Sequence, residues 1–182
     1  MIYSILFYGD FLKIRLGDTC FIVEFYFILM LLSALLLEAD NLLELLIFSS
    51  LHEIGHLAAL YIAGGKADEI KLSFYGFAIK YSVKLKRNRE FLVLLAGPAV
   101  NLVLFILFRN GINLMLFLFN ILPIYPLDGG RILNLYMIKV NRYISFIFLF
   151  FLFCLSFYLL FKFGVFSMLL ICFYLTIYSI MY

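Results

Sequence analysis

Charged residues are scarce in this sequence, and their scarcity decides the class of protein. Only 14% of the 182 residues are Asp, Glu, Lys or Arg, whereas 66% are hydrophobic. A soluble domain is about half apolar and about a quarter charged, so this chain has too little polar surface to cover a water-exposed globule. The sequence therefore predicts an integral membrane protein whose main environment is the lipid bilayer.

Other scarcities exclude further classes. The net charge is only +3, and the basic residues lack the aromatic interleaving that nucleic-acid binding requires, so no nucleic-acid partner is expected. The cysteines, Cys20, Cys154 and Cys172, form no CxxC pair and are interpreted as small buried apolar residues. The N-terminus has no basic segment before a long apolar run, so no cleavable signal is expected.

Long apolar runs predict six membrane spans in one domain over residues 1–182, without a PDZ or CBS domain. The predicted spans are 20–37, 41–63, 91–108, 112–138, 143–162 and 164–182. The fourth span is interrupted because Pro123 and Pro126 remove helical hydrogen bonds. Broken backbone at membrane depth survives only where protein or a polar cavity surrounds it, so the break is itself a candidate site. The predicted fold class is an all-α polytopic membrane protein with a broken fourth helix.

Basic residues are unevenly divided between the two sides. With a cytoplasmic N-terminus, Arg109 and Lys162 fall outside and the other twelve of the fourteen basic residues fall inside. The positive-inside rule therefore predicts that both termini are cytoplasmic.

Two segments are predicted to form strand pairs at the cytoplasmic face. Residues 3–16 alternate around a turn at Gly9–Asp10, and residues 69–85 do so around Tyr75–Gly76. The alternatives are interfacial loops with aromatic anchors, or a small sheet whose edge pairs with an extended peptide.

The second span carries the motif His52-Glu53-Ile54-Gly55-His56, which contains both histidines of the chain. Residues i and i+4 share one face of a helix, so both imidazoles can bind one metal ion. Glu53 is rotated by about 100° from His52 and can address a metal-bound water. The motif lies about 13 Å below the end of the span at Ala63, inside the hydrocarbon zone. Ionisable groups at that depth are costly unless they are paired, so a metal site is favoured over two hydrogen-bonded core histidines.

A zinc ion held by two histidines needs a further ligand. Asp128, in the broken span, is the only acid after Glu90. It is interpreted either as the cap of a following half-helix or as the third ligand, and the HExxH motif favours the ligand. Asn120 is a candidate donor to a carbonyl oxygen of a substrate. Asn101 is assigned a structural role, bonding backbone near Pro98.

Three motifs in order, HEIGH (52–56), AGPAVN (96–101) and NILPIYPLDGG (120–130), resemble those of the site-2 protease family of intramembrane zinc metalloproteases. The resemblance implies that His52, His56 and Asp128 hold Zn²⁺, that Glu53 activates water and that Asn120 contacts substrate. The short six-span form resembles the sporulation branch of the family, which processes a pro-sigma factor in the membrane around the bacterial forespore. Ile121 departs from the more frequent NPxP pattern.

The expected activity is hydrolysis of a peptide bond in a membrane-associated protein substrate, in or near the membrane. Family analogy adds a membrane inhibitor or regulator protein as a partner, and a homo-oligomer is possible. The alternatives are a metal-transporting or metal-binding membrane protein and an inactive protease-like scaffold. Spans five and six are almost wholly apolar, which favours a protease over a transport path.

Overall fold

The computed structural model describes residues 4–8, 11–16, 19–36, 40–73, 76–82 and 85–181. They form two compact units, Met1–Leu116 and Phe117–Tyr182. The elements of the first unit are β1 (Ser4–Tyr8), β2 (Phe11–Leu16), β3 (Thr19–Glu24), α1 (Phe25–Leu36), α2 (Asp40–Ile62), β4 (Glu69–Ser73), β5 (Gly76–Lys80) and α3 (Arg87–Phe108). Helix α4 (Gly111–Asn120) begins in this unit, and the second unit holds α5 (Asp128–Tyr136), α6 (Ile138–Phe163) and α7 (Ser167–Met181).

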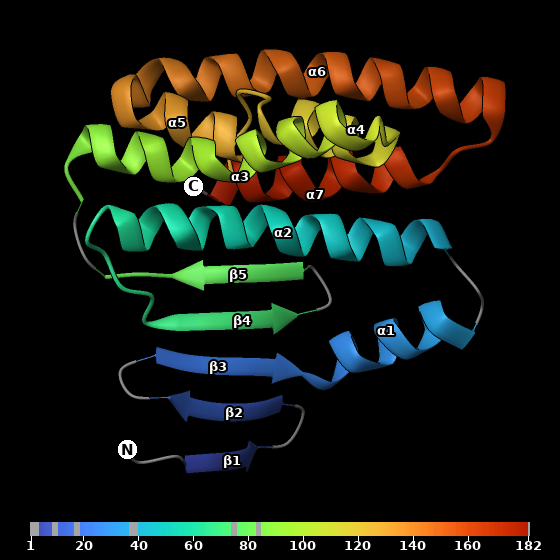
Figure 1. The fold of residues 1–182 in the computed structure, drawn as a ribbon. Coiled ribbons are helices and arrows are strands. Elements are labelled where there is room, and N and C mark those ends of the chain that lie inside the picture. The colour runs from blue at the N-terminus through green and yellow to red at the C-terminus, as the bar shows by residue number, and fades with distance from the viewer. Residues whose placement is uncertain are drawn as a thin grey trace. The chain divides into compact units, whose positions relative to one another are not determined.

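The strands form one five-stranded sheet in the order β1-β2-β3-β4-β5 (Figure 1). Strands β3 and β4 are parallel, and the other neighbours are antiparallel. Both predicted strand pairs are confirmed as β1–β2 and β4–β5. The predicted turn residues Gly9, Asp10 and Tyr75 lie outside the described residues, and the placement of the sheet at the cytoplasmic face stays a prediction.

The predicted start of the first span is wrong. Residues 20–24 belong to β3, which pairs with β2 and β4, and the described helix α1 has only 12 residues. At 1.5 Å per residue, α1 is about 18 Å long and shorter than the hydrocarbon layer. Residues Phe21–Val23 are apolar enough to be part of a span, but β-branched and aromatic residues also favour a strand. Hydrogen bonding to β2 on one side and to β4 on the other stabilises the strand.

Three helices within the described ranges are long and apolar enough to cross a membrane: Asn41–Ile62, Arg87–Phe108 and Val140–Phe163. They confirm the second, third and fifth predicted spans and mark an integral membrane protein. The sixth prediction was too long, because α7 has 15 residues. The fourth is broken as predicted, since α4 ends at Asn120 and α5 starts at Asp128.

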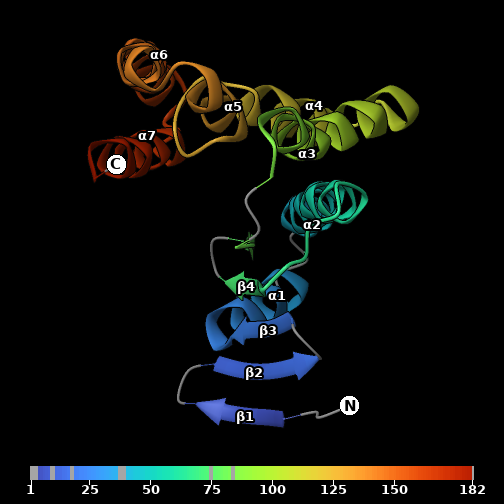
Figure 2. The same ribbon diagram turned by 90° about the vertical axis from the view of Figure 1, so that its left-hand side faces the viewer.

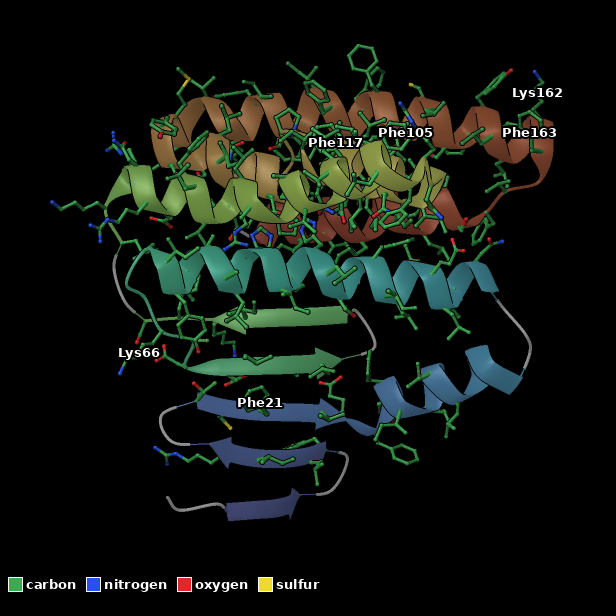
Figure 3. The ribbon with its side chains drawn as sticks, viewed as in Figure 1. Phe21, Lys66, Phe105, Phe117, Lys162 and Phe163 are labelled. Atoms are coloured by element: carbon green, nitrogen blue, oxygen red, sulfur yellow. The ribbon has the colours of Figure 1, made fainter. Side chains whose placement is uncertain are left out.

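The core of the first unit joins the sheet to two helices. Leu60 of α2, Ala67, Ile70 of β4 and Val93 of α3 are all buried and form one cluster. Phe21 of β3, labelled in Figure 3, packs against it. Figure 1 shows β5 running alongside α2. Burial of these side chains fixes α2 against the sheet on one side and α3 on the other.

The core of the second unit forms around the broken segment. Ile124, between α4 and α5, is fully buried against Leu149 of α6 and Leu175 of α7. At the C-terminal end of α6, Lys162 places its ammonium 5.3 Å from the ring centroids of Tyr158 and Phe163 (Figure 3). Basic and aromatic side chains gathered at a helix end are typical of a membrane–water interface.

Candidate metal centre

The centre is built where α2 and α3 lie side by side, and Figure 2 shows both helices end-on. Gly55 makes the close approach possible. A Cβ built on Gly55 would lie 2.8 Å from Val100 Cγ2 and 3.0 Å from the Ala96 carbonyl oxygen, closer than side chains normally pack. Small residues let transmembrane helices approach in this way, because van der Waals packing replaces the hydrophobic effect within lipid.

Both histidines of α2 point into this contact. His52 and His56 are 5% and 8% exposed, whereas Ile54 is 53% exposed on the opposite side of the helix. Their Nε2 atoms lie 3.1 Å apart. The i, i+4 spacing therefore brings two imidazole nitrogens to one point, as the sequence predicted.

Each imidazole is held by α3 through its other nitrogen. His56 Nδ1 lies 2.7 Å from the Val93 carbonyl oxygen, and His52 Nδ1 lies 2.9 Å from Asn101 Nδ2. A carbonyl only accepts, so His56 Nδ1 carries the proton and its Nε2 presents a lone pair. Metal-binding histidines are typically oriented by such a second hydrogen bond.

Gly97 of α3 lets both imidazoles pack directly against the backbone of α3. A Cβ built on Gly97 would lie 2.6 Å from His52 Nε2 and nearer still to His56 Nε2, so a larger residue would displace both rings. Glu53, the residue after His52, is half-buried. One ligand atom from each of His52, Glu53 and His56 lies within 4.8 Å of the others. Two imidazoles and a carboxylate suit a divalent metal with a bound water.

Asp128 is the first residue of α5, and the residue in the N-cap position is Leu127. The alternative interpretation of Asp128 as the helix cap is therefore not confirmed. Its carboxylate is buried and lies 3.5 Å from Arg131 Nη1, one turn along α5. A carboxylate in the first turn is also stabilised by the helix dipole. That Asp128 completes the metal site with the histidines stays a prediction.

Polar side chains of α6 satisfy the backbone of the broken segment. Ser145 Oγ donates to the Pro123 carbonyl at 3.1 Å, and Asn141 Nδ2 donates to the Gly130 carbonyl at 3.0 Å. Both side chains are buried. Cβ atoms on Gly129 or Gly130 would collide with the backbone of residues 121–125, so only glycine permits this close approach. Non-helical backbone in a membrane protein requires this kind of internal satisfaction.

Asn120 ends α4 and is half-buried. Its predicted contact with a substrate carbonyl stays a prediction.

The hydrogen-bond partner predicted for Asn101 was wrong. Its amide bonds His52 instead of backbone near Pro98, and the side chain is fully buried. Gly97 and Asn101 are four residues apart, the same spacing as His52 and His56, and both pairs face the α2–α3 contact. This matched spacing was the sequence signal that could have linked AGPAVN to HEIGH.

Two curated relatives share part of this chain. One is a putative zinc metalloprotease of Synechocystis sp., 35% identical over 114 residues, which covers 50% of this chain and 30% of the relative. The other is a zinc metalloprotease of Methanocaldococcus jannaschii, 32% identical over 124 residues, which covers 57% of this chain and 36% of the relative. The chain thus spans about a third of the length of the curated relatives it matches. No protein-family model matches the sequence.

A solved structure extends the likeness to almost the whole chain. The site-2 protease from Methanocaldococcus jannaschii superimposes with a TM-score of 0.59 over 98% of this chain and 94% of that one, at 22% sequence identity. The fold is therefore similar to that of a solved site-2 protease, and the His-Glu-His group lies on a helix that is long and apolar enough to cross a membrane. Over about half of its length, the chain is similar in sequence to zinc metalloproteases.

Gly97→Ala tests the packing of the histidines against α3. Because the added methyl would overlap both Nε2 atoms, the two imidazoles would have to move, and we expect affinity for zinc to fall by roughly tenfold or more. The measurement is chelator competition on purified protein in detergent. Gly111→Ala is the matched control, because a Cβ there meets nothing within 4 Å. Equal zinc affinity in Gly97→Ala and the wild type would show that zinc binding does not depend on the positions of the two rings against Gly97.

Proposed function

We propose that this chain is a zinc endopeptidase of the site-2 protease type, which hydrolyses a peptide bond in or near the membrane in a membrane-associated protein. One observation carries the proposal: two buried Nε2 atoms lie 3.1 Å apart on an apolar helix, with Glu53 between the histidines in sequence. Ionisable groups in a span are costly, and a metal together with a catalytic water offsets that cost.

His52, His56 and Asp128 would hold the ion. When bound, zinc would polarise the scissile carbonyl and activate a water molecule. Glu53 would accept a proton from the attacking water and then deliver it to the leaving amine. Asn120 donates a hydrogen bond to the carbonyl oxygen as negative charge develops there.

The substrate must be extended at the cleavage site, because a helix keeps its carbonyls in hydrogen bonds. Strand β5 is an edge strand of the sheet and runs alongside α2, the helix that carries Glu53 (Figure 1). We therefore propose that β5 holds the scissile segment as an added strand.

Glu53→Gln tests the mechanism. Glutamine keeps the size of the side chain but cannot accept the proton, so we expect normal zinc content and loss of cleavage by a factor on the order of 100 or more. The assay incubates purified protein with a membrane-associated substrate, with and without a zinc chelator.

The choice of substrate tests the finer proposal, that the substrate is a pro-sigma factor as in stage IV sporulation protein FB. A sporulation pro-sigma factor is compared with an unrelated tail-anchored protein. If only the tail-anchored protein is cleaved, the proposed sporulation role is wrong but the proposed protease activity stands. Bound zinc without cleavage of any substrate, in wild type as in Glu53→Gln, would favour a metal-binding or scaffold protein.

Asp128→Asn tests the third ligand. We expect the amide to bind zinc more weakly by roughly tenfold or more, since an anionic ligand is lost. The control is Asp68→Asn, because Asp68 is an exposed acid in the turn before β4. The readout is zinc per protein after dialysis against a weak chelator. An unchanged ratio would show that Asp128 is not a zinc ligand.

We also propose that both termini are cytoplasmic in a bacterial cell membrane. Lys66, after α2, and Arg87, at the start of α3, lie on the side predicted to be inside, and Arg109 follows the other end of α3. In a variant without its native cysteines, Lys86→Cys should react with an impermeant thiol reagent only in opened cells. Asn110→Cys should react in intact cells. The reverse pattern would invert the topology.

A further inference from the structure

The second unit contains a polar cavity to which the proposed function gives no role. It has a volume of about 450 Å³ and lies between the end of α5, the start of α6 and the end of α7. Cavities of this size accommodate small molecules or the head of a larger one. Of the eight described residues that line it, seven carry a polar side-chain atom and only Ile138 is aliphatic. None of the eight is a predicted metal ligand, a predicted catalytic residue or a predicted substrate contact.

Buried polar side chains line the cavity. Asn141, Ser145 and Ser179 are all at least nine-tenths buried. Asn141 and Ser145 donate to backbone carbonyls of the broken segment and of the start of α5. The side chains of Ser179 and of half-buried Asn134 form no hydrogen bond with any residue that the structure describes. Buried polar groups normally have a partner, so these two side chains are available to a ligand in the cavity.

The charge around the cavity favours an anion. Asp128 is the only acid among residues 117–182, and its carboxylate lies 3.5 Å from Arg131. Arg142 is exposed, lines the cavity and forms no ion pair within the described part of the chain. A guanidinium group presents a rigid fork of donors that matches the oxygens of a phosphate group. Together with neutral donors beside it, this group is typical of a phosphate site.

The cavity lies at one end of a predicted membrane span. Helices α6 and α7 pack against each other and run in opposite directions, so the start of α6 and the end of α7 lie at the same end of this unit (Figure 1). Arg142 is two residues inside the apolar segment Val140–Phe163, about 3 Å along the helix axis. Two further lining residues, Ile138 and Tyr143, are 71% and 73% exposed. Exposed apolar and aromatic side chains beside a basic group at the end of a span are typical of the lipid headgroup level.

We propose that this cavity binds the phosphate group of an anionic phospholipid, at the membrane surface predicted to face the cytoplasm. Arg142 binds the phosphate oxygens, and Asn134 and Ser179 donate hydrogen bonds to the headgroup. The acyl chains leave the cavity along Ile138 and Tyr143 and enter the bilayer. Basic pockets between transmembrane helices on the cytoplasmic side are suited to anionic headgroups.

The bound lipid would contact the side chains that hold the broken segment. Asn141 and Ser145 line the cavity and also bond the backbone on either side of Asp128. Binding of the lipid therefore stabilises the arrangement of α5 and α6 without taking part in any reaction. The proposal requires neither zinc nor proteolysis, so its failure and the failure of the proposed function are separate results.

Arg142→Gln tests the proposal with short-chain lipids. Dihexanoyl phosphatidylglycerol and dihexanoyl phosphatidylcholine are titrated by calorimetry into purified protein in a nonionic detergent. Both lipids contain a phosphate, but the choline of the second adds a positive charge that Arg142 repels. We expect the wild type to bind the glycerol lipid roughly tenfold more tightly, and Arg142→Gln to lose this preference. Lys162→Gln is the matched control, because it removes one positive charge from the other end of the same helix and should keep the preference.

Equal affinity of the wild type for the two lipids would overturn the proposal, as would an equal loss in Lys162→Gln and Arg142→Gln. Glycerol 1-phosphate separates a lipid from a soluble phosphate compound. We expect it to bind at least roughly tenfold more weakly, since it has no acyl chains. Equal affinity would refute a lipid as the ligand. If Arg142→Gln does not fold, Ser179→Leu decides, because leucine fills part of the cavity without a change of charge. Unchanged binding of the glycerol lipid to Ser179→Leu would place the lipid outside the cavity and refute the proposal.

Discussion

The close approach of α2 and α3 is the constraint on which the metal centre depends. Gly55 lets the helices meet, and Gly97 lets both imidazoles pack against α3. The hydrogen bonds between the two histidines and α3 then act across a contact too short for larger side chains. Polar groups that would each be costly in lipid become hydrogen-bonding partners of one another. The positions of the polar side chains therefore depend on the packing of the small residues Gly55 and Gly97.

Much of this centre can be predicted from sequence because it is local. The i, i+4 spacing of His52 and His56 requires only that α2 be helical, and the interruption of the fourth span requires only that proline cannot donate a hydrogen bond. The two strand pairs are local as well, since each needs alternation and a turn. These predictions hold because each depends only on residues close together in the sequence.

The failures concern partners that are distant in the chain. Residues 20–23 pair with the neighbouring β2 and also with β4, which lies more than forty residues away. Asn101 bonds His52 across 49 positions, a relation that no periodicity within either helix contains. Its nearest sequence feature, Pro98, suggested a backbone partner instead. Tertiary pairing overrides local preference in both cases.

Helix α6 illustrates how few polar atoms are needed to fix an apolar helix in a bilayer. Most of its surface is Phe, Leu and Ile, which lipid accepts at any rotation and over a range of depths. Asn141 and Ser145 remove that freedom, because both bond the backbone of the loop and of the start of α5. Turning α6 about its axis, or sliding it by one turn, would remove the donors of the Pro123 and Gly130 carbonyls. These two residues therefore fix the rotation and depth of the 26-residue helix α6 relative to the loop and to the start of α5. Because Asp128 is the first residue of α5, they also help to fix its position within the second unit.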